Sequence, residues 1–246
     1  MLVLFTATTY STNCGLLEAA PDIPAAISSP GNQKIPLDAL NCASHIVFDL
    51  ETTGLSVNCG ITQIAASSID GRATFVHYIV PDQDISPGAS KVSLYSHMTS
   101  GECVLFKKGK CLEAIPVLPA LKAFIEWLPD NCALFVHNSV SFDMRVLMKA
   151  VEANGICESA IAKIIRFVNM LPVLKEACPL SSTSKPSGHS LGTIFERLFG
   201  ASISKAHDAL ADVDSVHKLF GKAKPKQKCN IRNTTVAASG LTQAVF

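Results

Sequence analysis

The sequence lacks the cysteine patterns that mark zinc sites and disulfide frameworks. Its nine cysteines are scattered singly along 246 residues, no two of them form a CxxC pair, and no Cys/His set has the spacing of zinc ligands. An odd, dispersed set of cysteines without a secretory signal is typical of free thiols in a reducing compartment. We therefore expect an intracellular protein, in the nucleus or the cytoplasm.

The chain also lacks long hydrophobic runs and an excess of charge of one sign. No stretch approaches the ~20 apolar residues of a membrane-spanning helix, so we expect no membrane partner. The formal net charge is +1, and attraction to a polyanion must therefore come from a local patch. At 48% hydrophobic and 17% charged residues, the composition suits a folded core and excludes global disorder.

Composition divides the chain into a leader, one domain and a tail. Residues 1–43 are rich in Ser, Thr, Ala, Pro and Asn, which predicts a poorly ordered leader. The domain is predicted over 44–220. Residues 221–246, with lysines at 222, 224, 226 and 228, are predicted to form a basic flexible tail.

Hydrophobic patterning predicts an α/β fold for the domain. Three strands are expected at 45–51, 61–69 and 73–80, the last two joined by a turn at Asp70-Gly71, and a long connection follows over 81–112. The remaining elements are expected as helices at 115–128, 141–154, 158–165, 171–177, 190–199 and 207–220, and as extended segments at 133–137 and 166–170. A meander followed by alternating elements predicts a mixed sheet of about five strands flanked by helices.

Two acidic residues end the first predicted strand. Asp49 and Glu51 are two positions apart, so their side chains project from the same face of the strand. Without a partner they would repel each other, and a divalent cation between them removes that cost. Taken alone, the pair is better explained as the end of a strand in water.

Three further polar residues are candidates on the same terms. Asp143 lies in the first turn of a predicted helix, where the helix dipole favours an acid without any function. Asp212 borders the buried face of the last predicted helix, so its side chain can point inward. His207, taken alone, is predicted to be a surface histidine. Its neighbour Asp208 is expected to face solvent or to stabilise the helix start.

Taken together and in chain order, these residues lie in three known motifs. The segments FDLETTGL, HNSVSFD and HDALAD resemble the DxE, Nx₃[FY]D and Hx₄D motifs of the DEDDh (DnaQ-like) 3′→5′ exonuclease superfamily, particularly its Trex-like members. The segments at 90–93, 167–172 and 189–192 are similar to further segments of that superfamily. Asn169 stands where the superfamily usually has Asp, and Ser93 stands where it usually has Thr. The resemblance spans about 45–220.

The resemblance implies a ribonuclease H-like fold with two Mg²⁺ or Mn²⁺ ions at the 3′ end of a nucleic acid. By the pattern of the superfamily, Asp49 would bridge both ions, Glu51 and Asp212 would hold one, and Asp143 would support the other. His207 would be the general base, because an imidazole can accept a proton near neutral pH. Four carboxylates carry a charge that two divalent ions neutralise, and oxygen ligands suit hard cations.

The same resemblance implies contacts to the terminal nucleotide, with Leu55 as an apolar wedge. The residues implied in substrate binding are Thr52, Thr53, Gly54, Leu55, Val92 and Asn138. Packing after a turn is the alternative role of Leu55.

Two other functions stay open from the sequence. An exoribonuclease of the oligoribonuclease type would use the same ions, and the contacts to the 2′-OH that would decide between them cannot be recognised in the sequence. An exonuclease-like interaction module, as in PML-type nuclear proteins, is disfavoured because all five motif residues are present. We expect 3′ ends of single-stranded or frayed DNA as the partner, and a homodimer stays open.

Overall fold

The computed structural model describes residues 44–93, 95–98, 104–137, 142–179, 188–223 and 235–237, and the predicted leader over 1–43 lies outside them. In this part of the chain the strands form a seven-stranded sheet in the order β10-β9-β8-β1-β2-β3-β7 and a small sheet in the order β4-β5-β6. The strands of the large sheet are β1 (Ser44–Thr52), β2 (Ile61–Ser68), β3 (Thr74–Val80), β7 (Ala114–Pro116), β8 (Cys132–Val136), β9 (Ile164–Asn169) and β10 (Thr235–Ala237). The small sheet consists of β4 (Tyr95–Met98), β5 (Val104–Lys107) and β6 (Lys110–Cys111).

Seven helices are described with these strands. They are α2 (Pro87–Ser93), α3 (Val117–Trp127), α4 (Asp143–Ala153), α5 (Cys157–Lys163), α6 (Leu171–Ala177), α7 (Leu191–Phe199) and α8 (Ala209–Lys222). None of the described helices is long and apolar enough to cross a membrane.

The pairing of the strands confirms the predicted mixed sheet. β1 runs antiparallel to β2, and β2 runs antiparallel to β3, which is the expected meander. β8 lies parallel to both β1 and β9. The sheet is larger than the expected five strands because β7 and β10, three residues each, add to its two edges.

The structure corrects the sequence-based prediction in three segments. The connection over 81–112 contains α2 and the small sheet, whose strands of two to four residues are too short for a period to be recognised. Residues 221–246 were predicted as a flexible tail, yet α8 continues to Lys222, and β10 pairs antiparallel with β9. The last helix begins at Ala209, not at 207, so His207 precedes it.

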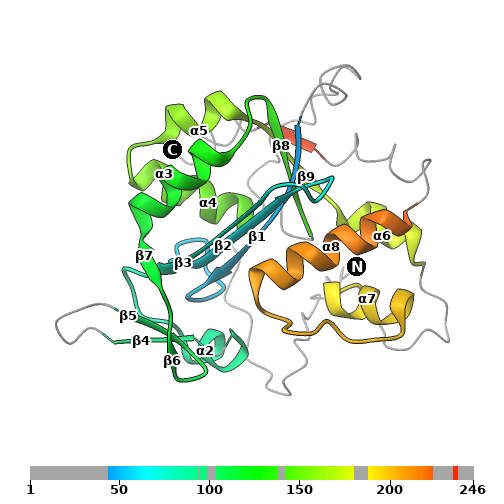
Figure 1. Cartoon of the computed structure of the whole chain (residues 1–246), viewed down its shortest axis with the longest axis horizontal. Helices are drawn as coiled ribbons and strands as arrows, with labels where there is room; N and C mark the ends of the chain where they lie inside the picture. The colour runs from blue at the N-terminus through cyan, green and yellow to red at the C-terminus, as the bar shows by residue number, and fades with distance from the viewer. Residues whose placement is uncertain are drawn as a thin grey trace, which may run out of the picture. The chain divides into compact units, whose positions relative to one another are not determined.

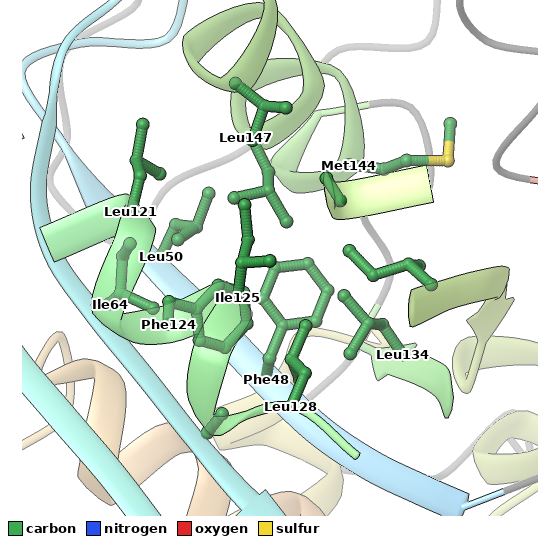
Figure 2. Close-up of a cluster of buried hydrophobic side chains, with 14 of the residues drawn as sticks. Phe48, Leu50, Ile64, Leu121, Phe124, Ile125, Leu128, Leu134, Met144 and Leu147 are labelled. Atoms are coloured by element: carbon green, nitrogen blue, oxygen red, sulfur yellow. The ribbon is translucent and has the colours of Figure 1, made fainter. Parts of the chain in front are cut away.

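Alternating side chains of β1 divide the core into two layers. Ile46, Phe48 and Leu50 belong to a cluster shared with α3, α4 and α5, part of which is drawn in Figure 2. Val47 belongs to a second cluster, which includes buried residues of α6, α7 and α8. Figure 1 shows the two groups of helices on opposite faces of the large sheet. Because side chains alternate along a strand, Asp49 and Glu51 continue the series of Val47 and face the layer of α8.

Because the core lies between the sheet and its helices, we expect a buried leucine to contribute much more to the free energy of unfolding than an exposed one. Leu121, on α3, has 0% of its surface exposed, whereas Leu55 is 89% exposed. Leu121→Ala should lower the free energy of unfolding by about 2–5 kcal/mol, because it leaves a cavity. Leu55→Ala should change it by less than about 0.5 kcal/mol. Urea unfolding followed by circular dichroism measures both, and equal losses would contradict this assignment of the core.

Candidate active site

Three carboxylates from two distant segments meet at the surface between β1 and α8. Oxygen atoms of Asp49, Glu51 and Asp212 all lie within 4.8 Å of one another. Asp212 stands in the first turn of α8, whose buried residues include Ala209 and Val213, and α8 contacts both β1 and β2. The apolar packing of α8 on the sheet therefore sets the distance between the acids.

Burial makes this cluster costly to ionise in the protein alone. It raises the pKa of Glu51 to about 8, and the charge of Asp212 adds to the effect. Burial likewise raises the pKa of Asp212 to about 7, against the effect of a backbone hydrogen bond from His207. The pKa of Asp49 is raised well above its ordinary value by burial and then by the charge of Asp143. Without a cation, burial and mutual repulsion therefore favour the protonated forms of these carboxyl groups.

Asp143 approaches the cluster from the opposite layer. It is the first residue of α4 and is 6% exposed. Of the neighbouring charges that raise the pKa of Asp49, that of Asp143 has the largest effect, whereas its effect on the pKa of Glu51 is the smallest of the neighbouring charges. Asp143 is therefore coupled mainly to Asp49. The predicted N-cap of this helix, Ser141, and the predicted substrate residue Asn138 lie outside the described residues. The residue at the N-cap position is Phe142.

His207 is exposed in the loop that leads into α8. Its φ angle is 63°, in the left-handed region that residues other than glycine rarely adopt. Burial of the imidazole and the charge of Lys107 both lower its pKa. The ring is therefore neutral at pH 7, which is the state that can accept a proton.

The loop after β1 holds the predicted substrate residues in a fixed shape. The buried Thr53 donates its backbone N–H to the carbonyl of Gly60 at 2.9 Å, and its hydroxyl accepts the N–H of Gly60 at 2.9 Å. The hydroxyl of Thr52 donates to the carbonyl of Gly54 at 2.8 Å. Leu55 lies at the exposed end of this closed loop. Val92 lies in α2, and the structure describes only its backbone.

Of the two predicted settings for Asp208, solvent exposure is wrong, and Asp208 stands at the N-cap position of α8, where the helix starts. Its side chain is only 16% exposed, and its Oδ2 atom lies 2.8 Å from Nζ of Lys107 and 3.3 Å from the hydroxyl of Tyr78, which donates to it. The sequence gives no local signal for this group, because Lys107 lies in the segment predicted as a connection. A charged partner from a distant strand is what keeps Asp208 from solvent.

Comparison with known proteins agrees with this geometry. A family model described as Exonuclease, of the RNase T type, matches residues 46–220. The chain is similar to the PolC-type DNA polymerase III of Streptococcus suis, with 27% identity over 185 residues, and to that of Streptococcus pyogenes serotype M18, with 29% identity over 190 residues. These matches cover 74% and 75% of this chain, but only 11% of each relative's length.

Solved structures of exonuclease I share the fold. One of these structures, which was used to explain the processivity of the enzyme, superposes with a TM-score of 0.58 at 20% identity. The match covers 75% of this chain and 42% of the other. The zinc-bound complex of the E. coli enzyme with single-stranded DNA superposes with a TM-score of 0.60 at 17% identity, covering 77% and 42%. With a ribonuclease H-like sheet, the acidic cluster and a family match over most of its length, the chain belongs to the RNase T-type exonuclease family, within the DEDDh (DnaQ-like) 3′→5′ exonuclease superfamily.

Proposed function

We propose that this chain is a metal-dependent 3′→5′ exonuclease that releases nucleoside monophosphates from the 3′ end of DNA. The observation that carries the proposal is the convergence of Asp49, Glu51 and Asp212 within 4.8 Å, from β1 and α8. Such a cluster destabilises the folded protein unless a cation or a proton compensates its charge, because like charges are brought together away from water. A module that only binds partners would have no need for it.

The donor set fits hard divalent cations such as Mg²⁺ or Mn²⁺. All three converging groups offer carboxylate oxygens. Burial and neighbouring acids raise the pKa values of Glu51 and Asp212, although the charge of Lys107 opposes the rise. We propose that Asp49, Glu51 and Asp212 hold one ion and that Asp49 and Asp143 hold a second. Bound ions of this kind polarise the scissile phosphate and stabilise the negative charge that develops in hydrolysis.

The other residues of the site have roles that follow from their positions. His207 would accept a proton from an attacking water, and two observations support this role: its pKa is lowered, which favours the neutral imidazole, and its backbone hydrogen-bonds to Asp212. Leu55 offers the terminal base an apolar surface, and the hydrogen-bonded loop of Thr52, Thr53 and Gly54 keeps that surface in place.

Single-stranded DNA is the substrate that we propose. Exonuclease I of E. coli, whose fold this chain shares, has been solved with dT13 and dA16 oligonucleotides. An exoribonuclease is the alternative that the activity experiment below decides. Nuclear or cytoplasmic location and a homodimer stay predictions.

The acidic cluster predicts that the metal-free protein loses stability as the pH rises. A carboxyl whose pKa is raised by folding stabilises the folded state below its unfolded pKa, and this contribution is lost as the pH rises through the folded pKa. For Glu51 and Asp212 the folded values are about 8 and about 7. In EDTA, the melting temperature should therefore fall between about pH 5 and 8, and Mg²⁺ or Mn²⁺ should restore it at pH 8.

Two variants isolate the contribution of the cluster. Asp49→Asn should flatten this pH dependence and melt above wild type at pH 8 without metal, because one buried charge is gone. Asp214→Asn removes the same charge from an exposed position on α8 and should leave the slope unchanged. Burial lowers the pKa of His137 to about 4, so this residue makes the stability of the folded protein rise with pH. Its contribution is the same in every variant and does not affect the comparison. A metal-free Asp49→Asn protein less stable than wild type would give Asp49 a structural role.

Cleavage of labelled oligonucleotides tests the proposed activity and its base together. With Mg²⁺, 5′-labelled DNA should shorten stepwise from its 3′ end, circular single-stranded DNA should stay intact, and EDTA should stop the reaction. His207→Ala should slow single-turnover cleavage by about 10²–10⁴-fold without weakening metal binding. A defect that disappears at high Mg²⁺ would contradict the role of general base. Faster cleavage of RNA would favour the exoribonuclease.

Leu55→Ala should weaken substrate binding without loss of stability. Burial of a leucine side chain against a base is worth about 1.5–3 kcal/mol, so KM should rise by about tenfold or more while the protein melts as wild type does. Val76→Ala is the control, because Val76 is apolar and 39% exposed but lies on β3, outside the loop. An unchanged KM would leave Leu55 without a role as wedge.

A further inference from the structure

The start of α8 is fastened to three different strands. The backbone N–H of Ala209 donates to Oε1 of Gln63, on β2, at 3.1 Å. Tyr78, on β3, donates its hydroxyl to Asp208 at 3.3 Å, and Nζ of Lys107, at the end of β5, lies 2.8 Å from the same carboxylate oxygen. In Figure 1 the small sheet lies beside the loop that leads into α8, as the contact of Lys107 requires.

Lys107 contacts two consecutive residues of that loop. In addition to the carboxylate of Asp208, its ammonium group donates to the backbone carbonyl of His207 at 3.4 Å. His207 has a φ angle of 63°, a left-handed conformation that residues with a side chain rarely adopt and that persists where the surroundings enforce it. The ammonium group is placed to enforce it, because it holds the carbonyl of His207 and the residue that follows.

The Lys107–Asp208 pair is partly withdrawn from water, which makes it stronger than a surface ion pair. Each side chain is 16% exposed. Removing one partner leaves the other charge poorly solvated, so the loop would have to move to rehydrate it. The body of α8 would stay in place, because Val213, Val216 and Leu219 remain buried against the sheet.

We propose that Lys107 is a positioning residue for the imidazole of His207. It acts through the carboxylate of Asp208 and the backbone of His207. Its charge also lowers the pKa of Glu51 and Asp212. Lys107 thereby supports the site from the end of β5, a strand that contains none of the three motifs. The proposal rests on the proposed function, since it presupposes that His207 takes part in hydrolysis.

Single-turnover cleavage of 5′-labelled DNA by Lys107→Met tests this role against a matched control. Lys110 lies directly opposite Lys107 in the β5–β6 pairing and is exposed, so Lys110→Met removes the same charge from the same hairpin. Lys107→Met should slow cleavage by about 10–100-fold with the affinity for the 3′ end unchanged. Lys110→Met should leave the rate unchanged, and Lys107→Arg, which keeps a charged donor, should restore most of it.

The His207→Ala background separates positioning from a general loss of structure. There, Lys107→Met should cause no further slowing, because the group that it positions is gone. A full additional loss in that background, or an equal loss in Lys110→Met, would overturn the proposal. Should Lys107→Met fail to fold by circular dichroism, Asp208→Asn breaks the same pair from the other side and should show the same non-additivity. Inactive wild-type protein would overturn the proposed function, whereas active wild type with a neutral Lys107→Met overturns the positioning role alone.

Discussion

The packing of α8 against β1 and β2 is the contact on which the rest of the candidate site depends. It brings Asp212 to Asp49 and Glu51 across a separation in sequence that no local preference could close. The contact is built from small and branched apolar residues, including Ala209, Val213 and Val216, which allow the helix to lie close to the sheet. The acids meet because the apolar residues around them are buried, and not because they attract one another.

This packing brings three acidic side chains together at the end of β1, in the middle of the large sheet, where their repulsion destabilises the fold. Burial raises the pKa of each of the three converging acids, so in the metal-free protein the cluster opposes folding when it is ionised. Two apolar layers, one on each face of the large sheet, offset this cost. A site of this kind gains stability from the cations that it binds, and stability and function are then coupled through the same ions.

The chain is similar to one part of much longer polymerases and to one part of a longer exonuclease. It spans 11% of the PolC-type relatives and 42% of exonuclease I. With exonuclease I the chain shares the fold, and the exonuclease family model matches its residues 46–220. The small sheet with Lys107 lies inside that region yet outside the three motifs, between β3 and α3.

The sequence by itself determined the main elements of the fold and the identity of the candidate residues. Alternation in β1 and the apolar face of α8 are local patterns, so they could be recognised without a structure. They placed Asp49 and Glu51 on one face of a strand, and Asp212 at the border of the buried face of a helix. The order and spacing of the motifs then indicated the superfamily. Only the tertiary structure decided which residues surround them. The Lys107–Asp208 pair joins residues about a hundred positions apart, the strands that carry Lys107 are too short to have a period, and the left-handed backbone of His207 results from contacts rather than from its residue type. Long-range ion pairs depend on where distant elements pack, and that information is absent from any single segment of the chain.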